Sequence, residues 1–126
     1  MAEFVYDPPD AAPVILYADD HIVVADKQAG LLSVPGRGDE RTDCLINRLR
    51  DTFPDILLVH RLDLDTSGVM VFGRTRAAQG FLGQQFEKRL TKKIYLARLW
   101  GRLEGGAGRV DLPLIVDWPN RPRQHV

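Results

Sequence analysis

A polar segment of nine residues separates two short apolar runs in the middle of this chain, and no other feature constrains the fold as strongly. The runs are Ile56–Val59 and Val69–Phe72, and the segment between them reads His60-Arg61-Leu62-Asp63-Leu64-Asp65-Thr66-Ser67-Gly68. Short apolar runs bounded by polar residues and glycine are typical of strands. The pattern therefore predicts two strands joined by a polar loop, and loops on rigid elements are where catalytic and binding groups concentrate.

The sequence of the N-terminal part, residues 1–38, indicates an arm, a hairpin and a loop. Residues 1–13 are rich in proline, which cannot sustain a β-ladder, so an extended arm is expected. Val14–Tyr17 and Ile22–Ala25 are apolar, β-branched runs separated by a short polar stretch, which predicts a β-hairpin. Residues 30–38 carry three glycines and a proline and predict a loop.

Two helices are predicted, one before and one after the polar segment. The first has Thr42 or Asp43 as its N-cap and Pro54 as its stop, with apolar residues at helical spacing: Leu45, Ile46, Leu49 and Phe53. The second has Thr75 as its N-cap and runs to about Arg89.

Two further strands complete the predicted elements. They are Ile94–Trp100 and Val110–Val116, the second broken by Pro113. The order β-β-α-β-β-α-β-β predicts an α+β fold with a mixed, largely antiparallel sheet and flanking helices. With 126 residues and 44% hydrophobic content, the chain can build one such core, which we assign to residues 14–126.

Composition excludes several classes of protein. No run approaches the roughly 18 consecutive apolar residues of a membrane helix, and the acidic N-terminus lacks a signal-peptide pattern, so a soluble cytoplasmic protein is expected. Cys44 is the only cysteine, which excludes an intrachain disulfide and a cysteine zinc cluster. We expect Cys44 to be buried as an apolar residue.

The net charge of zero conceals a division along the chain. Residues 1–85 hold 8 Lys/Arg and 13 Asp/Glu, whereas residues 86–126 hold 9 Lys/Arg and 4 Asp/Glu. The densest basic stretch contains Lys88, Arg89, Lys92, Lys93, Arg98 and Arg102. These cations are suited to meeting nucleic-acid phosphates, or equally to forming a solvated helix end with favourable charge at its C-terminus.

Several chemistries fail to account for the polar segment. His60, Asp63 and Asp65 have a ligand-like spacing, but the other two histidines lie in no cluster that would complete a metal site. The aspartic-protease turn is broken by Ser67, and the chain has neither a nucleophile elbow nor a P-loop. What remains is a carboxylate beside Arg61, which suits a reaction at a glycosidic carbon. From the residues alone, an arginine and an aspartate close together in a loop are more often a structural ion pair, here between Arg61 and Asp63 or Asp65.

The polar segment resembles the motif H-R-L-D-x-x-T-S-G of the RluA family of pseudouridine synthases. Residues 15–27 and 30–36 resemble the opening hairpin and the K-P-x-G-L loop of that family, although Gln28 stands where the family usually has proline. Residues 92–101 resemble its K-x-Y-x-A-x-x-x-G segment. Residues 111–114 and 117–122 resemble the RluA subgroup itself, whose substrates include 23S rRNA and tRNA anticodon loops.

The resemblance implies an enzyme that isomerises uridine to pseudouridine within RNA without a cofactor or a metal. It assigns Asp63 as the catalytic residue, whether as nucleophile or as base, and it assigns Arg61 and Tyr95 to substrate binding. Asp65 falls at a variable position of the motif and is expected to be a solvated or turn-capping carboxylate. From the residues alone, a tyrosine in such a segment is more often an ordinary sheet-packing residue, and this alternative stays open for Tyr95.

The synthase domain of this family is longer than the present chain, so we expect residues 14–126 to be the N-terminal portion of an incomplete catalytic fold. An alternative is a truncated RNA-binding module without turnover, which keeps the basic stretch and Tyr95. A glycosidase is a third class, which predicts hydrolysis and a second working carboxylate.

Overall fold

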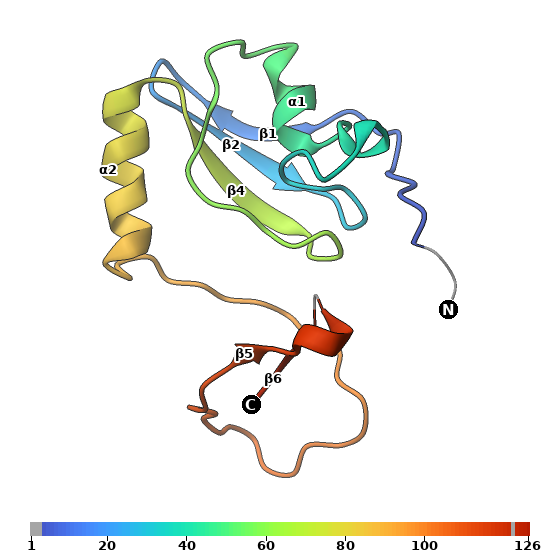
Figure 1. Ribbon diagram of the computed structural model, residues 1–126. Helices are drawn as coiled ribbons and strands as arrows, with labels where there is room; N and C mark the ends of the chain where they lie inside the picture. Colours follow the sequence, from blue (N-terminus) through green and yellow to red (C-terminus); the bar gives the residue numbers. More distant parts are fainter. Residues whose placement is uncertain (1–3, 122) are drawn as a thin grey trace. The chain divides into compact units, whose positions relative to one another are not determined.

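The computed structural model describes residues 4–121 and 123–126, so residues 1–3 of the predicted arm and Pro122 lie outside it. The chain divides into two units, Met1–Lys93 and Ile94–Val126. The helices α1 and α2 and the four-stranded sheet belong to the first unit, and β5 and β6 to the second (Figure 1).

The sheet of the first unit is antiparallel throughout. Its strands are β1 (Val14–Ala18), β2 (Ile22–Lys27), β3 (Leu57–Leu58) and β4 (Gly68–Gly73), arranged in the order β1-β2-β4-β3. The predicted hairpin and the predicted pair of strands around the polar segment are thus both confirmed. Because β3 and β4 are neighbours, the polar segment leaves one edge strand and returns into the middle of the sheet.

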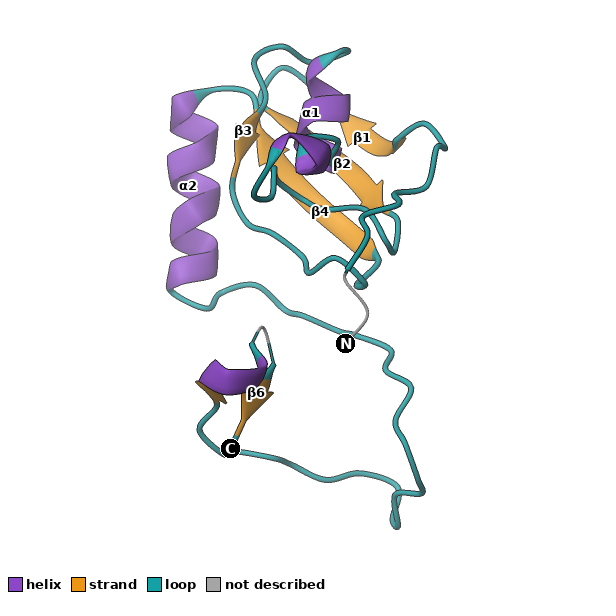
Figure 2. Ribbon diagram, turned by 45° about the vertical axis from the view of Figure 1, so that its right-hand side comes forward, coloured by secondary structure: helices purple, strands orange, loops and turns teal. Residues whose placement is uncertain are grey.

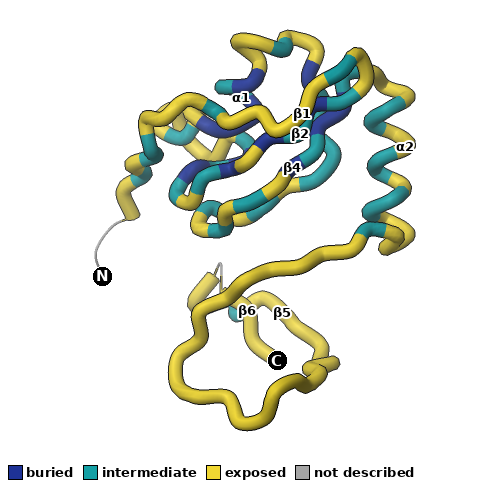
Figure 3. Tube along the Cα trace, turned by 180° about the vertical axis from the view of Figure 1, so that it is seen from behind, coloured by how far each residue is buried: buried dark blue, intermediate teal, exposed yellow. Residues whose placement is uncertain are grey.

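The core lies between one face of the sheet and α1 (Leu45–Arg50). Val23 lies opposite Phe72 and Ala25 opposite Met70 in the β2–β4 ladder, and all four are fully buried. The helix and its flanks complete the cluster with Leu31, Cys44, Leu45, Ile46, Leu49 and Ile56. Figure 3 shows this buried layer in the sheet and around α1. Cys44 is buried as expected, and burial raises the pKa of its thiol.

The first helix differs from its prediction at both ends. It starts at Leu45 after an extended Cys44, and no side chain caps it. Instead, the carbonyl of Leu32 accepts from the Leu45 amide at 2.7 Å and the carbonyl of Ser33 accepts from the Ile46 amide at 3.2 Å. Backbone groups from a distant loop therefore satisfy the free amides of this helix end, which local sequence does not reveal. The helix ends at Arg50, four residues before Pro54.

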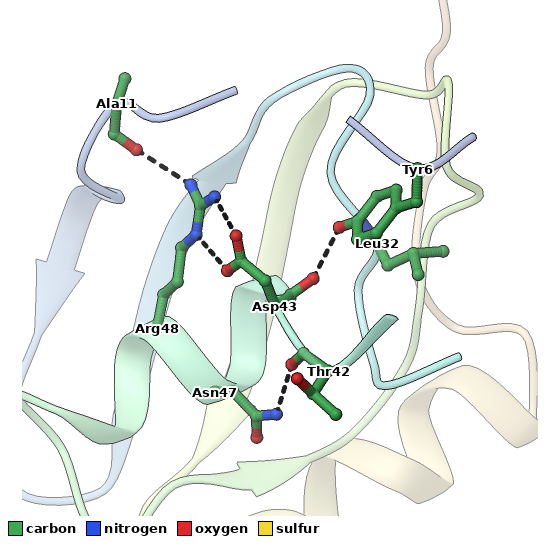
Figure 4. A network of polar contacts seen from close by, with 7 residues as sticks. All are labelled: Tyr6, Ala11, Leu32, Thr42, Asp43, Asn47 and Arg48. Atoms are coloured by element: carbon green, nitrogen blue, oxygen red, sulfur yellow. Dashed lines mark hydrogen bonds and ion pairs between the residues drawn. The ribbon is translucent and has the colours of Figure 1, made fainter. Parts of the chain in front are cut away.

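Asp43, a predicted cap, instead holds the N-terminal residues against the body (Figure 4). Its carboxylate accepts two hydrogen bonds from Arg48 at 2.7 and 2.8 Å, and this bidentate pair lowers the pKa of Asp43. Its carbonyl accepts from the Tyr6 hydroxyl at 2.6 Å, and Arg48 also donates to the Ala11 carbonyl at 3.1 Å. Residues 4–13 contain no helix or strand, but these bonds fix them at two points.

The second helix, α2 (Arg76–Glu87), begins as predicted. The Thr75 side chain accepts from the Ala78 amide at 3.1 Å, which confirms Thr75 as the N-cap. A side chain at Gly73 would place its Cβ 3.0 Å from the backbone nitrogen of Gln79, so glycine permits the close approach of helix and strand. The side-chain Nε2 of Gln79 donates to the Leu58 carbonyl at 2.8 Å, and α2 lies beside the β3–β4 side of the sheet (Figure 2).

The second unit has little regular structure. Its strands β5 (Ile115–Val116) and β6 (Gln124–His125) form one short antiparallel pair, and a 3-10 turn occupies Trp118–Asn120. The predicted strand over residues 94–100 is wrong, because these residues join no ladder of the described chain and all are exposed. A strand needs a neighbour to satisfy its backbone groups, and the described part of the chain pairs none with this segment. Of the predicted strand Val110–Val116, only the last two residues, after Pro113, form a ladder.

Another 3-10 turn occupies Asp39–Arg41 in the loop before α1. No helix among the described residues is long and apolar enough to cross a membrane.

Candidate active site

The polar segment is anchored at its start by His60. The Nε2 atom of His60 accepts a hydrogen bond from the Val71 amide of β4 at 3.1 Å. Its ring stacks on Phe86 of α2, with centroids 4.3 Å apart and planes at 19°. Burial, and secondarily the charge of Lys93, lowers the pKa of His60, so the neutral form that can accept this bond is favoured. His60 therefore fixes the segment between strand and helix.

The loop after β2 holds the polar segment on either side of Asp63. The buried Ser33 hydroxyl donates to the Leu62 carbonyl at 2.6 Å and accepts from the Leu62 amide at 3.1 Å. The Gly30 amide donates to the Leu64 carbonyl at 2.8 Å. The residues immediately before and after Asp63 are thus both bound by the same neighbouring loop.

A buried lysine completes this attachment. Lys27, the last residue of β2, has no exposed surface, and its ammonium donates to three backbone carbonyls: Gln28 at 2.8 Å, Leu31 at 2.6 Å and Leu64 at 3.1 Å. Burial lowers the pKa of Lys27, while the negative charges of Asp65 and Asp63 raise it. A buried cation is tolerated when its donors are satisfied and anions lie nearby, and both conditions hold here.

Sequence reasoning assigned no function to Lys27 or Ser33. A signal for Lys27 was present, because it follows the buried residues Val23 and Ala25 at the two-residue spacing of one strand face. A charged residue at such a position must find partners inside the protein. Nothing comparable distinguished Ser33 from the other small polar residues of its loop.

Asp63 itself is exposed at the turn of the polar segment. Its carbonyl accepts from the Thr66 amide at 3.1 Å, which closes a turn over residues 63–66. Within residues 4–121 and 123–126, no group donates a hydrogen bond to its carboxylate, and Arg61 pairs with neither Asp63 nor Asp65. The structural ion pair that the sequence left open is therefore not formed. The carboxylate is accessible on a backbone that is held in place.

The three predicted site residues are not equally placed. Arg61 and Asp63 lie two residues apart on the same loop, and both are exposed. Tyr95 belongs to the second unit, where the residue is 58% exposed. Among the described residues, no group of three or more His, Cys, Asp or Glu side chains is arranged to hold a metal ion.

The fold, the held loop and the motif together define a class, and comparison with known proteins identifies it. The chain belongs to the RNA pseudouridylate synthase family, whose model matches residues 21–118 and so includes the whole polar segment. The expected family resemblance is confirmed.

Its relatives include bacterial enzymes of one kind. The chain is 51% identical over 127 residues to the dual-specificity RNA pseudouridine synthase RluA of Vibrio vulnificus, covering 100% of this chain and 51% of the relative. It is 52% identical over 122 residues to the protein of the same name from Escherichia coli K12, covering 96% of this chain and 56% of the relative. The chain therefore spans about half the length of these curated relatives.

A solved structure agrees with the family assignment. Human RNA Pseudouridylate Synthase Domain Containing 4 matches with a TM-score of 0.50 and 28% sequence identity, over 61% of this chain and 30% of that chain. The α+β fold with an antiparallel sheet is thus that of part of a synthase domain.

Proposed function

We propose that this chain carries the catalytic aspartate of an RNA pseudouridine synthase, which isomerises uridine to pseudouridine within a structured RNA. The observation that supports this most directly is the state of Asp63. Its carboxylate is exposed and free of hydrogen bonds to described residues, while Ser33 and Lys27 bind the backbone on either side of it. A catalytic group needs this combination of accessibility and fixed position.

The reaction breaks the C1′–N1 bond of uridine and forms a C1′–C5 bond, with N1 gaining a proton and C5 losing one. An ionised Asp63 can attack C1′ or act as a base on the sugar, and either route requires a carboxylate near that carbon. The ammonium of Lys27 is buried behind the loop and donates to the Leu64 carbonyl, so it helps to hold the backbone next to Asp63. No step requires a cofactor or a metal.

Access to C1′ requires the base to leave its stack, which costs a few kcal/mol. In this proposal Arg61 fills the space that the base vacates, and the exposed ring of Tyr95 stacks on the extruded uracil. Stacking of one base on an aromatic side chain contributes roughly 1–3 kcal/mol, enough to offset much of that cost. The proposed substrates are stem-loops of 23S rRNA and of tRNA anticodons, which the resemblance of residues 111–114 and 117–122 to the RluA subgroup implies. The names of the curated relatives, dual-specificity RNA pseudouridine synthases, are compatible with two kinds of RNA substrate.

The test is release of tritium from uridine labelled at C5, in an anticodon stem-loop and in a ribosomal RNA hairpin. Asp63→Asn keeps the shape of the side chain and removes its charge, so release should fall to background while RNA affinity is retained. Asp65→Asn is the matched control in the same turn, and it should retain most of the release because Asp65 is not assigned to the chemistry.

Three outcomes are informative. Equal release by the unchanged chain and by Asp63→Asn would refute the assignment of Asp63. RNA binding without release by the unchanged chain would identify an RNA-binding module without turnover. Free uracil in place of pseudouridine would indicate a glycosidase.

A further inference from the structure

The C-terminal end of α2 has an unusual residue at its cap. The Leu90 amide donates to the Gln85 carbonyl at 2.9 Å and the Arg89 amide to the Phe86 carbonyl at 3.1 Å, the pair of bonds that defines a Schellman motif. The position after such a cap is left-handed and is usually glycine. Here it is Arg89, with φ of 55°, the only residue other than glycine with a positive φ in the described chain. The chain thus keeps an arginine where glycine is conformationally easier.

This arginine borders a hollow on the surface of the first unit. The hollow has a volume of about 370 Å³ and is lined by Phe86, Arg89, Thr91 and Lys93. The two cations belong to a run, residues 86–93, with four basic residues and one acidic residue, Glu87. None of the four basic side chains forms an ion pair with another described residue. Their charge is therefore available to a ligand.

One lining residue of the hollow, Phe86, is in contact with the polar segment. The Lys93 ammonium lies 5.5 Å from the centroid of the Phe86 ring, within the range of a cation–π contact. The same ring stacks on His60, the first residue of the polar segment. A ligand in the hollow would thus lie one side chain away from the loop that carries Arg61 and Asp63.

We propose that this hollow binds a phosphodiester of the RNA substrate. Arg89 and Lys93 supply the positive charge and Thr91 a hydroxyl donor, which is the chemistry that recognises a phosphate without reading sequence. Contact through Phe86 and His60 sets the bound nucleotide beside the Asp63 loop, so the site positions the RNA for the reaction. The proposal rests on the proposed function, because it takes RNA as the ligand.

The decisive variant is Arg89→Gly. It removes the charge and also relieves the left-handed backbone, so the midpoint of urea unfolding should stay the same or rise. RNA affinity, measured by fluorescence anisotropy with a labelled anticodon stem-loop, should fall several-fold. The slope of log affinity against log salt concentration should decrease by about 0.7 to 1, the value for one lost phosphate contact. Adding Lys93→Met should roughly double that decrease.

Arg76→Ala is the matched control, because Arg76 is an exposed arginine at the opposite end of the same helix. It changes the net charge by the same amount and should leave the salt slope nearly unchanged. Equal effects of Arg89→Gly and Arg76→Ala, or no effect of either, would overturn the phosphate site.

The two proposals can fail separately. Asp63-dependent tritium release together with an unchanged salt slope in Arg89→Gly would refute the phosphate site and leave the synthase standing. A lowered salt slope in Arg89→Gly, with no tritium release by the unchanged chain, would support the phosphate site and refute the synthase. If the unchanged chain shows no salt-dependent RNA binding, both are overturned.

Discussion

The two units of this chain contain similar apolar runs, but only one unit buries them. In the first unit, Val23, Ala25, Met70 and Phe72 lie on adjacent strands and are covered by α1. In the second, Ile94, Leu96 and Trp100 are at least 96% exposed, and residues 94–100 pair with no other strand. An alternating or apolar run becomes a strand when another segment completes its hydrogen bonds, so the difference arises from partners rather than from composition.

The same contrast separates the proposed catalytic group from the proposed base-stacking group. Asp63 lies on a loop whose neighbouring residues are bound by Ser33, Gly30 and Lys27. Tyr95 lies on backbone that no ladder in the described chain holds. We infer that the carboxylate is positioned before substrate binds, whereas the aromatic ring depends on further contacts for its position.

The largest expected effect is on stability, and two aromatic truncations test whether the first unit buries its apolar residues while the second leaves them exposed. Phe72→Ala leaves a cavity in the β2–β4 core and should lower the free energy of unfolding by about 3–5 kcal/mol. Trp100→Ala removes a fully exposed side chain and should change it by less than about 0.5 kcal/mol. Urea unfolding followed by circular dichroism measures both. Comparable losses in the two variants would show that Trp100 is buried in solution, and a concentration dependence of the midpoint would then identify self-association as the cause.

The elements that the sequence predicted correctly are those set by local signals. The hairpin β1–β2 follows from two β-branched runs around a turn in which Asp19 accepts from the amides of His21 and Ile22. The start of α2 follows from the Thr75 cap. The polar segment between β3 and β4 follows from its apolar flanks. Each of these signals lies within a few residues of the structure that it specifies.

The elements that were missed depend on distant partners. The N-terminus of α1 is satisfied by carbonyls of Leu32 and Ser33, so no capping side chain marks it. The attachment of Lys27 to Leu64 joins residues 37 positions apart. The role proposed for Asp63 rests on the family resemblance, because an aspartate near an arginine in a loop is by itself more often a structural ion pair. Such contacts join residues that are far apart in the chain, so the periodicity of the sequence cannot predict them.

The second prediction concerns that attachment, with Lys27→Met as the variant. Methionine fills a similar volume and removes the cost of burying a charge, but it leaves the buried carbonyl of Leu31 and the partly buried carbonyl of Gln28 without the lysine donor. Because unsatisfied buried carbonyls cost more than the relieved desolvation returns, stability should fall by about 1–3 kcal/mol. Tritium release should fall more than the folded fraction does, since the Leu64 carbonyl also loses a bond beside Asp63.

Lys88→Met is the control for this variant, because Lys88 is an exposed lysine at the end of α2. It should alter stability by less than about 0.5 kcal/mol. Lys27→Arg is a second variant. If it loses stability but keeps full activity per folded molecule, Lys27 contributes to the fold alone. We expect Lys27→Arg to restore neither stability nor activity, because the larger guanidinium cannot make the three hydrogen bonds that the lysine ammonium makes in one fixed geometry.

The smallest effect is a pH dependence that begins at His60. Burial holds the pKa of His60 below its ordinary value of about 6.5 in the folded state, so the unfolded chain binds the proton more readily. The stabilising contribution is therefore complete above about pH 6.5 and is lost as the pH falls from there toward the lowered folded-state pKa. Asp19 and Asp43, whose pKa values are also lowered, act only in a more acidic range, below about pH 4.

His60→Gln separates this contribution from the others. Glutamine can still accept from the Val71 amide but does not titrate, so urea midpoints measured between pH 7.5 and 5 should decline less steeply than in the unchanged chain. His21→Gln removes an exposed imidazole and serves as the matched control. A decline of equal slope in His60→Gln and the unchanged chain would mean that the imidazole is as accessible to protons when folded as when unfolded. The stack on Phe86 would then not shield His60 from solvent. The start of the Asp63 loop would be less firmly held than the structure indicates, and the difference between this loop and the exposed second unit would be smaller.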